Sequence, residues 1–350
     1  MISAAGPDQA RASRRPSWLG RLTWVAWRQD RAAAIGLALG LGALALFIYF
    51  TALKAHGLSA RFQDHCLLLH SPVPVGCATL FTPMQGARLA PLLAPTAIGM
   101  FLGAPLLARE YAAGTTRFAW TQGSGRTRLV VTRLILAALA TLAAGAGLGW
   151  VAQWSLTPDA KDLPLSLAVG WQALPFNATP LTLAGVALLG LAVGVLAGAA
   201  ARRVVPAMAA TAAVGIAVFA LSYRLHDRLL GLGARTTRAL AGVQPWGRAT
   251  PNGLISLDRV SGSGSSGWPG SWLSQGWYTG PDGHRIIGGR VPQLMSMSLR
   301  QLTGRHISFW VSYQPARRYE LLVSVQAGLT VLLALILGAL AVGLVRRRNA

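Results

Sequence analysis

Six runs of largely apolar residues divide the chain, and each is long enough to cross a lipid bilayer as an α-helix. They cover residues 32–53, 89–108, 134–154, 180–201, 204–223 and 321–345. A spanning helix needs about 20 such residues, and none of the six runs contains Asp, Glu, Lys or Arg in its interior. Arg202 and Arg203 separate the fourth run from the fifth, which predicts a tight turn at one membrane surface. The pattern predicts an all-α polytopic membrane protein with six transmembrane helices.

Basic residues between the runs predict how the chain is oriented. If the N-terminus is cytoplasmic, the cytoplasmic segments hold 16 Arg, whereas the two short outer loops hold four Lys or Arg. Short loops rich in Lys and Arg face the cytoplasm. We therefore expect both termini in the cytoplasm, a multi-pass location in the inner (plasma) membrane, and one larger extracytoplasmic segment between helices five and six.

Four regions follow from this topology. They are a cytoplasmic tail with an interfacial helix (1–31), spans one to five with a cytoplasmic loop at 109–133 (32–223), the extracytoplasmic segment (224–320), and the sixth span with a basic tail (321–350). Residues 18–31 mix Trp and Leu with Arg, which favours a helix lying in the membrane surface. A plain extension of the first span is the alternative. Residues 224–320 are rich in Gly, Ser and Trp, and we expect a small, loosely structured domain there.

The amino-acid composition excludes most classes of soluble protein. Hydrophobic residues make up 53% of the chain and charged residues 12%, about half the charged share of an average soluble domain. The net charge of +22 would suggest nucleic-acid binding in a soluble protein. Here the charged residues lie between apolar runs, as in a membrane protein. We therefore expect this chain to contact the lipid bilayer and not to bind nucleic acid.

No catalytic constellation emerges from the sequence. A phosphate-binding P-loop needs Gly-Lys followed by Ser or Thr, but the two lysines, Lys54 and Lys161, follow Leu53 and Ala160. The six spans hold no acidic or basic side chain, which argues against a proton- or ion-coupled transporter. We expect no enzyme activity, cofactor or metal site, and any ATP hydrolysis on a separate chain.

Two cysteines lie close together in the sequence. Cys66 and Cys77 fall in the first predicted outer loop, and an oxidising compartment permits a disulfide between them. Two unpaired thiols are the alternative.

Glycines recur in the third and fourth spans. They are Gly145, Gly147, Gly149, Gly185, Gly190, Gly194 and Gly198. Small residues let helices approach closely. This favours a packed bundle and a dimer interface over a ligand pocket.

The loop between spans two and three is the most informative segment. From residue 106 to residue 134 it reads LLAREYAAGTTRFAWTQGSGRTRLVVTRL. Thr115 or Thr116 can cap a short helix, which glycines at 123 and 125 would end. A short helix with an exposed Trp120 suits docking on a partner. The alternative is a basic loop that sets orientation, with Trp120 in the interfacial aromatic belt.

The same loop resembles the permease subunits of actinobacterial ABC export systems, the type-2 export permeases. The similarity rests on Ala108-Arg109-Glu110, Gly114-Thr115, Ala119-Trp120-Thr121-Gln122 and Arg126. Three further stretches are similar, WVAWRQDR at 24–31, ARRVVPAM at 201–208 and YQPARR at 313–318. The matches are short, but they extend over nearly the whole chain in the right order.

The resemblance implies a permease subunit that forms the substrate pathway of an ATP-driven exporter. Its partners would be a separate P-loop ATPase and a second permease copy or a related permease. A coupling helix would lie in the loop, and the residues implied in coupling are Arg109, Glu110, Gly114, Thr115, Arg117, Trp120, Thr121, Gln122 and Arg126. The chain departs from the family pattern because Ala112 or Ala113 takes the place of a second acid.

The substrate stays open, since drugs, lipids and peptides all fit the sequence. The alternative function is a non-transport membrane sensor or assembly component whose extracytoplasmic segment binds a ligand.

Overall fold

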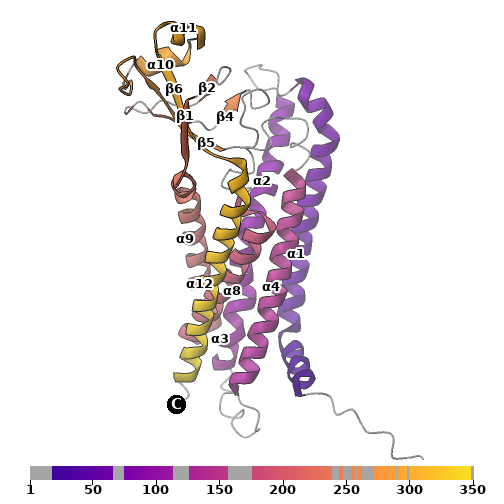
Figure 1. Ribbon diagram of the computed structural model, residues 1–350. Coiled ribbons are helices and arrows are strands. Elements are labelled where there is room, and N and C mark those ends of the chain that lie inside the picture. The colour runs from indigo at the N-terminus through magenta and orange to yellow at the C-terminus, as the bar shows by residue number, and fades with distance from the viewer. Residues whose placement is uncertain are drawn as a thin grey trace, which may run out of the picture.

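Among the residues that the structure describes, seven α-helices and one π-helix build an upright bundle (Figure 1). The computed structural model describes residues 18–65, 75–112, 126–156, 176–238, 244–246, 252, 254–256, 259–261, 272–288, 290–297 and 299–347. The bundle contains α1 (Trp18–His65), α2 (Val75–Ile98), the π-helix η2 (Gly99–Gly103), α3 (Ala104–Ala112), α4 (Arg126–Leu156), α8 (Pro180–Ala201), α9 (Val204–Gly231) and α12 (Tyr319–Arg347).

The bundle contains the six predicted spans. Helical stretches long and apolar enough to cross a membrane cover Arg31–Lys54, Leu89–Arg109, Val130–Ser155, Pro180–Ala201, Val204–Gly231 and Tyr319–Arg347. Their number and positions confirm the prediction. α1 begins at Trp18 and runs without a break into the first span. The beginning of α1 and the end of α12 lie at the same end of the bundle, as an even number of spans requires (Figure 1).

Helix α8 lies at the centre of the bundle. It packs against α2, η2, α3, α4, α9 and α12, and most of its length is buried. Local sequence sets both of its ends. Thr179 caps the first turn by accepting a hydrogen bond from the backbone N–H of Thr182, and Pro180 follows at the first helical position. At the other end Arg202 has a left-handed φ of 57° and its N–H bonds Gly198 O.

The predicted turn at the two arginines is confirmed. α8 ends at Ala201, Arg203 is extended, and α9 begins at Val204. Both arginine side chains are exposed. They therefore lie at the surface of the bundle and not within a span.

A small domain built on β-strands stands on one end of the bundle, between α9 and α12 (Figure 1). We call residues 235–314 the β-domain. It contains β1 (Arg235–Arg238), β2 (Gln244–Trp246), β3 (Ile255–Ser256), β4 (Arg259–Ser261), β5 (Trp272–Thr279), α10 (Arg290–Met295), α11 (Leu299–Gly304) and β6 (Ser308–Gln314). One antiparallel sheet has the order β1-β6-β5-β3, and β2 pairs with β4 in a second sheet.

These strands correct the prediction of an all-α chain. β6 reads SFWVSYQ, and its buried residues Phe309 and Val311 alternate with less buried neighbours. Such alternation is the mark of a half-buried strand. Phe309 and Val311 join Ile255, Tyr278 and Val291 in a separate hydrophobic core, so the β-domain has a packed interior of its own.

The junction between the β-domain and the bundle is tied by a buried amide. The Gln314 side chain is 1% exposed, and its Nε2 donates to Leu230 O at 2.7 Å and to Leu232 O at 3.1 Å. Arg318 Nη1 donates to Gly233 O at 2.6 Å. The end of α9 and the beginning of α12 are therefore held together where they enter the β-domain.

Candidate functional site: the α2–α3 face of helix α8

Glycines let the second span approach the centre of the bundle at backbone distance. Gly190, Gly194 and Gly198 recur every four residues along α8, so they share one helix face. A methyl group added to Gly190 would collide with Pro95 O, one on Gly194 with Gly99 O, and one on Gly198 with Ala104 O. Each glycine therefore faces a backbone carbonyl of the second span, and the contact leaves no room for any side chain.

The second span carries a π-turn at this contact. The backbone N–H of Ala104 donates to Gly99 O, five residues earlier, instead of to the carbonyl four residues earlier. Gly99 and Gly103 are both buried, and a methyl group on Gly103 would lie 2.6 Å from Leu191 O. π-turns inside α-helices are rare and frequently mark functional sites.

These contacts revise the role predicted for the span glycines. Gly145 and Gly149 of α4 approach α8 and Pro180, and Gly185 approaches α12. The close packing within the bundle was predicted correctly, and the predicted dimer interface stays a prediction. Gly147 is different, since nothing lies within 4 Å of a methyl group there.

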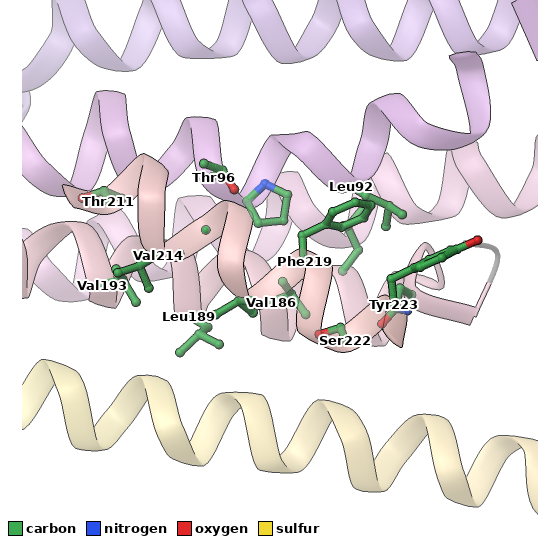
Figure 2. A pocket seen from close by; sticks show the side chains of 16 residues that line it. Leu92, Thr96, Val186, Leu189, Val193, Thr211, Val214, Phe219, Ser222 and Tyr223 are labelled. Carbon is green, nitrogen blue, oxygen red and sulfur yellow. The ribbon is translucent and has the colours of Figure 1, made fainter. Parts of the chain in front are cut away.

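An apolar pocket opens beside the π-turn, between α2, α8 and α9 (Figure 2). We call it the side pocket. Its volume is about 70 Å³. It is lined by Leu92, Pro95, Thr96, Asn177, Leu183, Val186, Leu189, Gly190, Val193, Thr211, Val214, Gly215, Val218, Phe219, Ser222 and Tyr223. Ligand pockets for whole small molecules are several times larger, so this space holds an apolar part of a molecule, such as a few methylene groups.

Two polar side chains that line the side pocket are engaged with the protein. Thr211 Oγ1 donates to Ala207 O at 2.7 Å, and Asn177 Oδ1 accepts from Gln326 Nε2 at 2.5 Å. Val214 on the α9 side is exposed. The pocket therefore offers an apolar surface that is reached from the side of the bundle.

The end of α3 connects this region to the loop singled out by sequence. α3 ends at Ala112, and α3 and α12 end at the same end of the bundle (Figure 1). Tyr111 is half-buried beneath the turn between α8 and α9, with the Arg202 guanidinium 6.0 Å from its ring centre. Among the described residues, the Tyr111 hydroxyl has no hydrogen-bond partner.

Most of the predicted coupling residues fall in a part of the chain that the structure does not describe. Arg109 lies exposed in the last turn of α3. Glu110 belongs to α3 and Arg126 begins α4, but their side chains are outside the described set. The remaining predicted residues are Gly114, Thr115, Arg117, Trp120, Thr121 and Gln122, and all six lie within residues 113–125, outside the described residues. The proposed contact between Glu110 and Arg117 stays a prediction.

The disulfide is also untested by the structure. Cys66 lies outside the described residues, and Cys77 is placed only as a backbone position in α2. Within the described part of the chain, no group of three or more His, Cys, Asp or Glu side chains could hold a metal ion.

One buried charge was not anticipated from the sequence. Arg133, in the first third of α4, is only 6% exposed and has an interaction partner in the protein. Because Arg133 stands at the edge of an apolar run, the sequence suggests only that it helps to set the orientation of the span in the membrane. The apolar run begins only at residue 134, so the sequence carried no signal that this side chain is buried.

The six spans define a multi-pass membrane protein, and a family comparison makes the class more specific. The sequence model of the family described as ABC-2 membrane transporter related matches residues 38–225, which is more than half of the chain. The chain belongs to this family, which supports an ABC transporter permease and implies association with an ABC ATPase. No curated protein and no solved structure matches the chain.

The matched region has a clear structural meaning. It begins in the first span and ends within α9, so it contains the side pocket and the whole contact of α8 with the second span. The β-domain and α12 lie outside it.

Proposed function

We propose that the chain is the membrane-spanning permease subunit of an ATP-driven exporter and that a separate P-loop ATPase binds it through residues 113–125. The observation that carries the proposal is the family match over the first five spans. In this proposal the chain is not itself an enzyme. The chain lies in the inner (plasma) membrane. Its α3–α4 loop faces the cytoplasm, as the distribution of arginines favours.

The packing of the second span supports a mechanical route from the loop to the substrate path. A push on the loop acts on α3, which is continuous with η2 and α2. The glycine contacts hold this span against α8 at backbone distance. Close-packed helices shift between discrete arrangements and do not deform continuously. The π-turn at Gly99–Gly103 is the place in the second span where such a shift begins.

The side pocket supports an apolar cargo in this proposal. It lies between the second span, α8 and α9, so it changes shape when the second span moves against α8. A molecule with an acyl or aromatic part enters it from the lipid side, where Val214 is exposed. A second permease copy or a related permease completes the pathway.

Co-purification with mass spectrometry tests the ATPase partner. The detergent-solubilised chain is isolated from its native host, and we expect a P-loop ATPase at about one copy per permease. Replacing residues 115–122 by a Gly/Ser linker should remove the ATPase while the chain stays monodisperse. Glu110→Gln should weaken ATPase coupling in stably inserted protein. Absence of any ATPase from folded, native-host material would overturn the proposal.

Filling the side pocket tests the substrate path. Val218→Trp places an indole in the pocket, whereas Ile216→Trp is the matched control because Ile216 is 64% exposed on the same helix and does not line the pocket. In the reconstituted complex, Val218→Trp should abolish the stimulation of ATP hydrolysis by apolar compounds, and Ile216→Trp should retain it. Equal behaviour of the two variants would remove the pocket from the transport path.

A sensor or assembly component is the second candidate, and the β-domain favours it. The segment that was expected to be loose has a packed core around Tyr278 and Phe309. A chain that binds a ligand through this domain and associates with no ATPase would establish the second candidate.

A further inference from the structure

A cationic cleft lies in the β-domain, well away from the candidate substrate path. It is an open space of about 570 Å³, and its polar lining consists of Asp282, His284, Arg285, Arg290 and Gln293. The lining residues lie between the end of β5 and α10, and α10 lies on the side of the β-domain away from the bundle (Figure 1).

The scaffold beneath the cleft is firmly built. The turn after β5 is closed by hydrogen bonds from Gly280 N–H to His284 O and from Gly283 N–H to Gly280 O, both 3.0 Å. The N–H of Ile286 then donates to Tyr278 O at 2.9 Å. From α10, Val291 and Leu294 enter the hydrophobic core of the domain. The cleft residues are therefore fixed at backbone level by a sheet on one side and by a packed helix on the other.

One of the two arginines is also held at its side chain. The Arg285 guanidinium stands 4.9 Å from the centre of the Trp277 indole ring. A guanidinium stacked on an indole keeps its N–H fork free for an acceptor and loses less conformational entropy on binding. Arg290, the first residue of α10, is exposed and lines the same cleft.

The charge balance favours an anionic ligand. Between the end of α9 and the start of α12, residues 232–318 contain ten Arg against two Asp. Asp282 is the one acid of the cleft, and its Oδ1 accepts a hydrogen bond from the His284 backbone N–H at 3.3 Å. Its carboxylate is thus partly engaged by the turn, while Arg285 and Arg290 both line the open space.

We propose that the cleft formed by His284, Arg285, Arg290 and Gln293 binds a phosphate group of a soluble or envelope-borne molecule. Arginine forks match phosphate geometry. The donors come from two elements, the turn after β5 and α10. A tetrahedral phosphate can accept hydrogen bonds from both, because its oxygens point in several directions. A planar carboxylate has two oxygens, and one guanidinium satisfies both. The site is separate from the side pocket, and its occupancy does not depend on the proposed export activity.

Calorimetric titration of the full chain tests the site. The protein is placed in phosphatidylcholine nanodiscs at near-physiological salt and titrated with tripolyphosphate, and with citrate as the carboxylate counterpart. We expect binding of tripolyphosphate, and weaker binding of citrate. Absence of binding, or equal binding of both anions, would overturn the assignment to phosphate.

Paired variants separate the cleft from the general positive charge of the domain. Arg285→Gln with Arg290→Gln should weaken tripolyphosphate binding about tenfold or more. Arg235→Gln with Arg238→Gln is the matched control, since both residues are exposed on β1 and lie outside the cleft. This pair should weaken binding less than about twofold, because exposed charges at a distance are screened by salt.

A pair of substitutions that keeps both charges tests whether a loss of binding comes from misfolding. Arg285→Lys with Arg290→Lys keeps both charges but removes the bidentate forks. It should bind with an affinity between the wild type and the Gln pair. Equal losses in the cleft pair and the β1 pair, with unchanged hydrogen exchange in β5 and β6, would show a diffuse electrostatic effect and overturn the proposal.

Discussion

Single glycines set the distance between helices in this bundle. Gly194 and Gly147 lie in different spans, and the two have opposite surroundings. A methyl group on Gly194 would meet Gly99 O and lie 2.9 Å from Ala104 N, whereas Gly147 has nothing within 4 Å. The same chemical change therefore has two different physical consequences in one protein.

Gly194→Ala should destabilise the chain and Gly147→Ala should not. At Gly194 the added methyl group forces α8 away from the second span, and overpacking of this kind costs about 1–3 kcal/mol. At Gly147 the gain in helix propensity of about 1 kcal/mol is unopposed. Thermal unfolding midpoints in one detergent measure both. A midpoint for Gly194→Ala equal to or above that of Gly147→Ala would contradict the close contact.

Tyr278 makes the β-domain sensitive to high pH. Burial raises the pKa of its phenol from 10.0 to about 12, and its hydroxyl donates to Leu294 O at 3.4 Å. The unfolded chain ionises first as the pH rises. The stabilisation is therefore fully present below pH 10 and is lost between pH 10 and about 12. In Tyr278→Phe, the thermal unfolding midpoint should decrease less between pH 10 and about 12 than in the wild type. Tyr223→Phe, at an exposed site, should leave this decrease unchanged.

At the scale of the element, the joint between α9 and α12 is held by two side chains, the buried Gln314 and Arg318. The amide of Gln314 supplies a donor to two carbonyl groups at the end of α9. An apolar side chain of similar size would leave both carbonyl groups without that donor, and a buried unsatisfied group costs about 1–3 kcal/mol.

Gln314→Leu should loosen the joint without unfolding either partner. We expect backbone amides near residues 230–235 to exchange hydrogen faster by about tenfold, because local opening then costs less. Gln275→Leu is the control, since Gln275 is exposed on the neighbouring strand β5. Hydrogen exchange followed by mass spectrometry measures both variants. Equal protection of the α9 end in both would show that the amide does not hold the joint.

The second span contains a feature that its sequence did not predict. Its apolar run predicted a single helix, and the length was correct. The π-turn at Gly99–Gly103 leaves the hydropathy pattern unchanged, because it inserts no polar residue and no proline. Pro105 follows the turn and lacks a backbone N–H. The opposing glycines of α8 let the turn pack at backbone distance, and that pairing is a property of the folded bundle.

At the scale of the molecule, the spans were predictable and the β-domain was not. Spans follow from length and hydropathy, which membrane insertion enforces strongly. Strands of two to eight residues between Gly- and Ser-rich connections give a weak signal, although the alternation in β6 was present in the sequence. The burial of Arg133 was not predicted for a related reason, since a charge near a span edge satisfies orientation and burial equally well.

Cysteine labelling tests the orientation of the whole chain. With Cys66 and Cys77 replaced by Ser, Asp282→Cys in the exposed β-domain should react with a membrane-impermeant maleimide added to intact cells. Arg202→Cys, exposed at the opposite end of the bundle, should react only after the cells are opened. Labelling of Arg202→Cys in intact cells, with Asp282→Cys protected, would reverse the predicted topology.

The pairing of β1 with β6 brings the two connections of the β-domain side by side. Arg235 stands opposite Tyr313 in the sheet, so the chain leaves the bundle and returns to it at nearly the same point. A segment with adjacent ends is geometrically an insertion in the hairpin between α9 and α12. A short turn could replace it without displacing either helix, and an unrelated domain with close termini could be grafted there. The membrane bundle and what it presents outside the bilayer are thus separable modules that evolution or a designer can exchange independently.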